Sequence, residues 1–283
     1  MRGVITRKLY LGLRTEPVPA SSTELETLGF AVLRGVFDAD QIATLRADID
    51  RVFEEFPPDV RVQEHAEEHW LPFRYEMLNR SGVSQRAVAD PAILQVIEPL
   101  LGEDCHVIAN TAWRQPPEES SHGGRYWHID SGPHVPRSPE VPWDSRIPYP
   151  IFAVAAHLML QDCPIEAGPT AVIPGSHTSG HAPPSDRLSD EGLTWEGHGA
   201  VPLTLAAGDV ALFVSDVWHR RLPSGVGDPG RYFLQCHYGR RDLAQRLRST
   251  SDANQLSAEA VERARSPRDR TLVGLHPARF YDG

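Results

Sequence analysis

The chain has 283 residues, of which 40% are hydrophobic, and a formal net charge of -10. This composition predicts a globular protein with a real core, built as one large domain or two small ones, and the negative charge disfavours nucleic acid and anionic membranes as partners. There is no apolar run of about 18 residues that would predict a transmembrane helix, no secretion signal, and only three widely separated cysteines, so we expect a cytoplasmic protein.

The first elements predicted along the chain are a helix and a strand. Ser21 and Glu24 have the spacing of a capping box, which opens a short helix that Gly29 ends. The apolar residues 30–33 then predict a short buried strand. Residues before this helix show no clear periodicity.

Two further helices are expected before residue 104. Asp38 and Gln41 predict the N-terminus of a helix whose apolar residues recur at helical spacing up to residue 56. A second helix begins at Asp90, followed by a proline, and runs towards Gly102, with Pro99 expected to kink or shorten it.

From about residue 104 the chain changes to short strands separated by turns. Proline-rich residues 131–150 and polar residues 178–200 predict long loops between these strands. Many short strands at close spacing are typical of a sandwich or barrel. The expected strands are 107–109, 151–160, 171–173, 201–205, 210–214 and 232–237, followed by a charged, helical region to about residue 265.

One segment, residues 126–130, carries the strongest chemical signal. Read as a strand, it projects His128 and Asp130 from the same face, so that both can bind one metal ion. A distant histidine, for which His219 is the candidate, would complete two histidines and one carboxylate. That set with open positions opposite is typical of non-heme Fe(II) sites that activate O2.

These pieces together resemble the phytanoyl-CoA dioxygenase-like (PhyH) family of Fe(II)/2-oxoglutarate-dependent oxygenases, which includes the ectoine hydroxylases. The resemblance implies a mainly β fold with flanking helices, a double-stranded β-helix or cupin-like jelly-roll barrel. We expect a single domain over 1–283, with a helical layer in 1–103, the jelly roll in 104–240 and a helical tail in 241–283. The motifs that carry the resemblance are 29–35, 127–130, 166–177 and 208–213, with His219 and Arg231.

The resemblance assigns roles to individual residues. It implies that His128, Asp130 and His219 are the catalytic iron ligands, and that Arg231, twelve residues after His219, binds the far carboxylate of 2-oxoglutarate. Asp130 also argues against halogenation, because halogenating relatives have a small residue there. Weaker candidates for co-substrate contact are His157, Thr111 and Gln115, and candidates for substrate contact are His134, Arg137 and Trp143.

We therefore expect Fe(II), 2-oxoglutarate and O2 to support hydroxylation or oxidative ring closure of a small molecule, with release of succinate and CO2. A sugar-like metabolite of specialised or antibiotic biosynthesis is the expected substrate class. Two alternatives are a zinc hydrolase that uses the same triad and a jelly-roll binding module without activity. Arg231 distinguishes the first, because a hydrolase has no need of a carboxylate-binding arginine at that position.

Two further histidine patterns have simpler interpretations. His65 and His69 match H-x-x-E-H, a zinc-peptidase spacing, but their polar neighbourhood favours a solvated acidic segment. His177 is interpreted as a residue that stabilises a turn by hydrogen bonding, not as a metal ligand.

Overall fold

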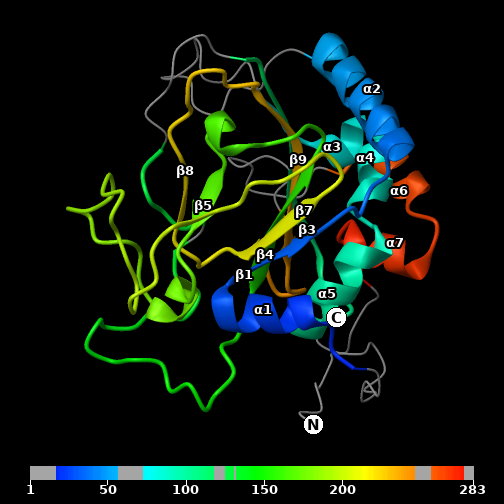
Figure 1. The fold of residues 1–283 in the computed structure, drawn as a ribbon. Coiled ribbons are helices and arrows are strands. Elements are labelled where there is room, and N and C mark those ends of the chain that lie inside the picture. Colours follow the sequence, from blue (N-terminus) through cyan, green and yellow to red (C-terminus); the bar gives the residue numbers. More distant parts are fainter. Residues whose placement is uncertain (1–16, 57–72, 118–124, 131, 246–255, 277–283) are drawn as a thin grey trace.

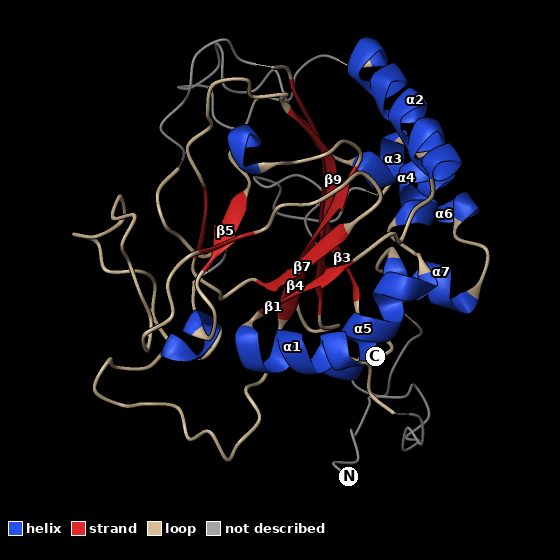
Figure 2. Ribbon diagram, viewed as in Figure 1, coloured by secondary structure: helices blue, strands red, loops and turns tan. Residues whose placement is uncertain are grey.

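The computed structural model describes residues 17–56, 73–117, 125–130, 132–245 and 256–276. Two antiparallel sheets form its centre, one of six strands in the order β1-β7-β4-β9-β3-β2 and one of three in the order β6-β5-β8. Helices cover the side of the large sheet that faces away from β5 and β8 (Figures 1 and 2). This arrangement confirms the predicted mainly β jelly roll with flanking helices.

The strands of the large sheet come from both ends of the described chain. β1 pairs with β7, and β4 lies between β7 and β9, so the N-terminal strand joins the jelly roll at one edge. The strand bounds are β1 Phe30–Leu33, β2 Phe73–Arg74, β3 His106–Gln115, β4 Ala153–Met159, β5 Thr170–Val172, β6 Val201–Pro202, β7 Val210–Val214, β8 His219–Arg221 and β9 Arg231–Gly239.

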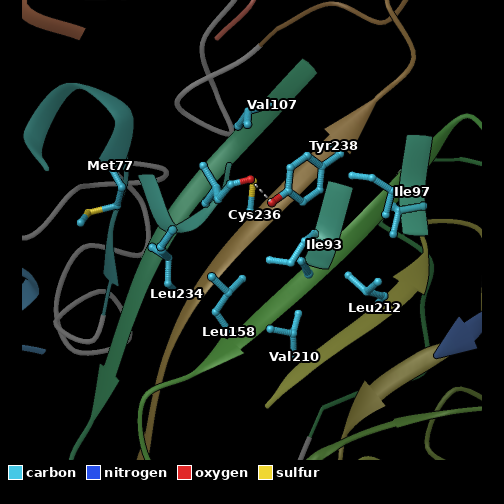
Figure 3. Packing of buried hydrophobic residues seen from close by; sticks show 14 of the residues in the cluster. Met77, Ile93, Ile97, Val107, Leu158, Val210, Leu212, Leu234, Cys236 and Tyr238 are labelled. Carbon is cyan, nitrogen blue, oxygen red and sulfur yellow. Dashed lines mark hydrogen bonds between the residues drawn. The ribbon is translucent and has the colours of Figure 1, made fainter. Parts of the chain in front are cut away.

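The helices pack on the outer face of the large sheet and form the main core with it. Every second residue of the central strands points to the helices, and β9 contributes Leu234, Cys236 and Tyr238 to this core (Figure 3). The Tyr238 hydroxyl donates to the Val88 carbonyl at 2.7 Å, which satisfies its one buried polar atom. The helix bounds are α1 Ala20–Leu28, α2 Ala39–Glu55, α3 Met77–Arg80, α4 Gly82–Ala87, α5 Pro91–Leu101, α6 Ala258–Arg263 and α7 Pro267–Leu272, with 3-10 turns Ile165–Ala167 and Ser176–Ser179.

The inner face of the same strands points to the small sheet and carries polar residues. β9 places Arg231, Phe233, Gln235 and His237 on this face, opposite Gln115, Trp113, Thr111 and Ala109 of β3. On its other side β9 pairs with β4, where His157 lies opposite Gln235. The period-two alternation of β9 therefore separates an apolar outer face from an inner face that can bind ligands.

Local sequence signals explain two of the helix boundaries. Asp38 accepts a hydrogen bond from the Gln41 amide and the Gln41 side chain accepts one from the Asp38 amide, both at 2.8 Å, so the predicted capping box of α2 is confirmed. Gly29 ends α1 in the left-handed conformation, with φ of 82°.

Several boundaries differ from the sequence prediction. α1 has Pro19 at its N-cap and makes no side-chain cap, so the capping box predicted at Ser21 and Glu24 is absent. α5 continues through Pro99 to Leu101 and is not shortened. The strand predicted over 201–205 pairs only at Val201–Pro202.

Other differences from the sequence prediction concern whole segments rather than the ends of helices and strands. The short strands β2 and β8 were not predicted, and residues 126–130 do not form a regular strand: His128 makes one isolated bridge to His219. The H-x-x-E-H pattern at 65–69 lies outside the described residues. No helix in the described ranges has the length and apolar character needed to cross a membrane.

Candidate metal and co-substrate site

Three potential metal ligands meet where the segment 126–130 crosses the start of β8. One ligand atom from each of His128, Asp130 and His219 lies within 4.8 Å of the other two. Nε2 of His219 is 3.2 Å from Oδ1 of Asp130, and the two imidazole rings are 4.3 Å apart. The residues that the sequence predicted as metal ligands are thus brought together in one cluster.

Backbone hydrogen bonds hold the three ligands in place. The amide of His128 donates to the His219 carbonyl and the amide of His219 donates to the His128 carbonyl, both at 3.0 Å. The Asp130 amide donates to the carbonyl of Ser215, directly after β7, at 3.1 Å. The segment is therefore fixed at both ends of the connection between β7 and β8, which crosses from the large sheet to the small one.

Hydrogen bonds also orient the two imidazole rings. Nδ1 of His128 is 2.8 Å from the Tyr126 carbonyl and Nδ1 of His219 is 2.9 Å from the Val217 carbonyl. A carbonyl only accepts, so each Nδ1 carries a proton, and Nε2 of each ring is the nitrogen that can bind a metal once it is unprotonated. Two such nitrogens and one carboxylate oxygen are a suitable donor set for a divalent transition metal.

The electrostatics of the cluster favour an ionised carboxylate. Burial opposes ionisation of Asp130, but the charge of His219 and its hydrogen bond outweigh burial and hold the pKa of the Asp130 carboxyl well below its usual value. Burial lowers the pKa of His128, and the neighbouring His219 lowers it further. Burial also opposes protonation of His219, yet Asp130 raises the pKa of this histidine above its usual value. The site thus holds a negative ligand beside basic nitrogens.

The triad opens into a cleft of about 1670 Å³ that also exposes the predicted co-substrate residues. Arg231 is only 6% exposed, and Nη2 donates to Oγ1 of Thr170 at 3.3 Å. The Nε atom of Arg231 and the Nε2 atom of His157 are buried without a hydrogen-bond partner among the described residues. A buried guanidinium and an imidazole with unsatisfied atoms fit a ligand with a carboxylate, such as 2-oxoglutarate.

The two weaker co-substrate candidates also line this cleft. Thr111 is buried on β3 opposite Gln235, while Gln115 lies opposite Arg231. The Gln115 side-chain oxygen accepts a hydrogen bond from Nη1 of Arg221 at 2.7 Å. This hydrogen bond joins Gln115 to Arg221, a different guanidinium from the one that the sequence assigned to the co-substrate.

The three substrate candidates of the loop 132–150 have different surroundings. His134 lines the cleft, where its ring stacks on Phe152 at 5.1 Å, and its Nδ1 hydrogen-bonds to Asp216. Arg137 donates to the Val141 and Thr178 carbonyls, and its guanidinium lies 5.1 Å from the Trp143 ring. Arg137 and Trp143 thus contact the loops themselves and do not line the cleft.

Sequence analysis missed a group of polar residues next to the triad. His237 lies on β9 with Nδ1 3.8 Å from Oδ2 of Asp130, and Gln235 and Trp113 line the same wall. The signal that could have found two of them is the alternation of β9, where polar residues 231, 235 and 237 alternate with apolar 232, 234 and 236. Asp216, the partner of His134, carries no such periodic signal.

With this geometry in view, comparison with known proteins assigns the chain. The sequence model of the family described as phytanoyl-CoA dioxygenase (PhyH) matches residues 25–223. The chain belongs to this family. It is accordingly an enzyme of the 2-oxoglutarate-dependent oxygenase class, which uses Fe(II), 2-oxoglutarate and O2. None of the curated protein sequences matches this PhyH member significantly.

Solved structures with the same fold come from several PhyH-like enzymes. EctD from S. alaskensis with bound Fe has a TM-score of 0.63 at 21% identity, with 86% of this chain and 83% of that chain covered. The epimerase SnoN from nogalamycin biosynthesis has a TM-score of 0.60 at 19% identity, covering 84% and 89%. HygX from Streptomyces hygroscopicus with nickel and 2-oxoglutarate has a TM-score of 0.59 at 17% identity, covering 85% and 92%. At these identities the likeness shows the fold.

Proposed function

We propose that this PhyH member binds Fe(II) at His128, Asp130 and His219, and that it hydroxylates or oxidatively cyclises a small molecule. Iron and 2-oxoglutarate supply the oxidising chemistry when bound: O2 is consumed, and 2-oxoglutarate is converted to succinate and CO2. The protein's part is to bind and orient the reactants. The observation that carries the proposal is the buried Arg231 in the cleft of the triad, which has no carboxylate within ion-pair distance among the described residues.

Arg231 is assigned to the far carboxylate of 2-oxoglutarate because of its surroundings. Burial lowers the pKa of this arginine, yet an arginine stays protonated, so the cleft holds a positive charge in need of an anion. Its guanidinium lies 4.9 Å from the Phe233 ring, which restricts its orientation, and Thr170 accepts one of its N–H groups. His157 is neutral, since burial and the charge of Arg231 hold its pKa well below its usual value, and Nε2 can contact the same ligand.

An anaerobic titration tests this proposal. Fe(II) followed by 2-oxoglutarate should produce the visible charge-transfer band of the chelate and saturate at one equivalent. Arg231→Leu should keep Fe(II) binding but raise the half-saturating 2-oxoglutarate concentration by about 100-fold, because removing one partner of a buried charge pair costs about 2–5 kcal/mol. The half-saturating 2-oxoglutarate concentration of Arg231→Lys should lie between those of the wild type and Arg231→Leu. Fe(II) binding without any band would contradict the proposal and favour the zinc hydrolase.

The proposed substrate is a hydroxylated specialised metabolite. Asp216 accepts hydrogen bonds from the His134 amide at 3.0 Å, from the His134 ring and from the Tyr149 hydroxyl at 3.3 Å. This carboxylate fixes the orientation of the His134 ring through Nδ1, and His134 lines the cleft, where an imidazole suits hydrogen bonding to a substrate hydroxyl. The structural likeness to SnoN, an enzyme of nogalamycin biosynthesis, supports the same substrate class.

A substrate screen tests the role of His134. Sugars and other hydroxylated small molecules would be tested for stimulation of 2-oxoglutarate consumption. For a compound that stimulates, His134→Phe should raise KM by about tenfold, the equivalent of one lost hydrogen bond, while 2-oxoglutarate consumption without substrate is unchanged. An unchanged KM would remove His134 from the substrate site.

A further inference from the structure

A chain of hydrogen-bonding side chains runs along the inner face of the large sheet to the metal cluster. Nε1 of Trp113 is 2.9 Å from Oε1 of Gln235, and Nε2 of Gln235 is 2.9 Å from Nε2 of His237. Nδ1 of His237 is then 3.8 Å from Oδ2 of Asp130, longer than a hydrogen bond. The chain ends at the carboxylate oxygen that does not face His219, which lies next to Oδ1.

The chemistry of Trp113 sets the direction of this chain. An indole N–H only donates, so the atom of Gln235 that faces it must be the amide oxygen. The Gln235 amide nitrogen then points to His237 and donates to Nε2, which must be unprotonated to accept. The single proton of the neutral imidazole is therefore on Nδ1. An N–H group of His237, and not a lone pair, faces the metal carboxylate.

The starting point of the chain is held rigidly. The Trp113 ring stacks on Phe233 with centroids 5.4 Å apart and an interplanar angle of 13°. Phe73 contacts the Trp113 ring edge-on, with centroids 3.8 Å apart and an interplanar angle of 86°. Trp113 pairs with Phe233 and Ala109 pairs with His237 in one β3–β9 ladder. The register of this ladder therefore fixes both Trp113 and His237, the two ends of the series of hydrogen bonds. The donor therefore has little freedom to turn away.

We propose that His237 is a positioning residue for Asp130, oriented by Trp113 and Gln235. Its Nδ1–H faces Oδ2 of the carboxylate and leaves Oδ1, beside Nε2 of His219, as the ligand atom. A carboxylate oriented by this N–H group would offer Oδ1 to a bound metal and keep Oδ2 turned towards His237. This inference rests on the proposed metal site but not on 2-oxoglutarate binding.

The experiment is a Co(II) titration of the apo-protein, followed by its visible d–d spectrum. His237→Leu removes the donor, and we expect a loss of Co(II) affinity of about 10- to 100-fold with a changed spectrum, the usual effect of losing an outer-shell partner. His237→Asn keeps an N–H close to the position of Nδ1 and should stay within about threefold of the wild type. Trp113→Phe releases the Gln235 amide and should weaken binding by about threefold or more.

Two controls separate positioning from general damage to β9. Cys236→Ala alters the outer face of the same strand between Gln235 and His237, so it should lower stability but leave Co(II) affinity unchanged. The double variant Trp113→Phe/His237→Leu should bind Co(II) no more weakly than His237→Leu alone, because both changes interrupt one chain.

The outcomes distinguish this inference from the proposed function. Failure of the wild type to bind Co(II) would overturn both. If the wild type binds Co(II) and His237→Leu binds it equally well, the role of His237 is overturned but the proposed function is not. The same holds if the losses of Co(II) affinity in Trp113→Phe and His237→Leu add in the double variant. Were His237→Leu to unfold, Trp113→Phe with wild-type affinity would overturn it equally well.

Discussion

His177 should make the stability of the protein depend on pH, although it is not part of the active site. The side chain is 1% exposed, its Nε2 is 3.1 Å from the Glu26 carbonyl, and its Nδ1 is buried without a partner among the described residues. Burial lowers the pKa of His177 from 6.5 to about 4, against the weaker opposing effects of the hydrogen bond to the Glu26 carbonyl and of the Asp216 charge. A proton on Nδ1 would be a buried N–H with nothing to accept it.

The sign and size of the effect follow from proton linkage. The unfolded chain takes up a proton near pH 6.5 and the folded protein only near pH 4, so the unfolded state binds more protons in between and stability falls as the pH falls. From about pH 7.5 to about pH 5, this histidine should remove about 2 kcal/mol from the free energy of unfolding. Below about pH 3 its contribution should no longer change.

The assay is urea unfolding of the apo-protein, with a chelator present so that metal binding does not contribute. His177→Gln keeps an N–H that can donate to the Glu26 carbonyl but cannot titrate, so its free energy of unfolding should fall less steeply over this range. The difference between the two proteins should grow by about 2 kcal/mol as the pH is lowered. Parallel curves for wild type and variant would refute the assignment of a neutral, unpaired Nδ1.

Three substitutions test the packing that supports the site. Gly29→Ala should lower the free energy of unfolding by about 1–3 kcal/mol, because φ is 82° and a Cβ would lie 2.6 Å from Nδ1 of His177. Gly35→Ala is the control for backbone strain alone, since Gly35 has φ of 58° but open space around it. Equal losses in the two variants would contradict a clash with His177. Asp38→Ala should reduce the free energy of unfolding by about 1 kcal/mol through loss of the capping box, and Asp38→Asn by much less; equal losses in both would contradict the cap. Leu158 packs in the core between the large sheet and the helices, so Leu158→Ala should lower the free energy of unfolding in urea by about 2–5 kcal/mol. Its Co(II) affinity should equal that of the wild type. Weakened metal binding would show that the two faces of the sheet are not independent.

Predictions from sequence succeeded where the signal is local or periodic. The capping box of α2 needs only residues three apart, and the strand at 210–214 is a continuous apolar run, so both could be assigned without knowing their neighbours. β8 has only three residues, two of them arginines, and it exists because Thr170–Val172 pairs with it. Its pairing is a tertiary effect that no propensity predicts.

The site residues divide in the same way, into those with a signal in the sequence and those that depend on tertiary contacts. His128, Asp130 and His219 were named from spacing and family resemblance, and the structure brings them together. Asp216 and Trp113 act through partners more than 80 residues away, at 134 and 235, and these pairs depend on strand register and loop path. The segment 126–130 was read as a strand that projects His128 and Asp130 from one face, but the structure forms a single bridge there. Its ligand geometry comes from backbone contacts to residues 215 and 219.

The crossing of residues 126–130 over the β7–β8 connection would couple metal binding at the proposed site to folding. The ligands are held by the end of a large-sheet strand and by the start of a small-sheet strand, so an ion shared among them ties the two sheets together at the cleft. An unfolded chain cannot present the three groups at once, and each tenfold excess of metal over Kd therefore adds about 1.4 kcal/mol to the free energy of unfolding. The fraction of unfolded molecules in a cell would then follow the supply of iron, and metal starvation would act on the lifetime of the enzyme as well as on its activity.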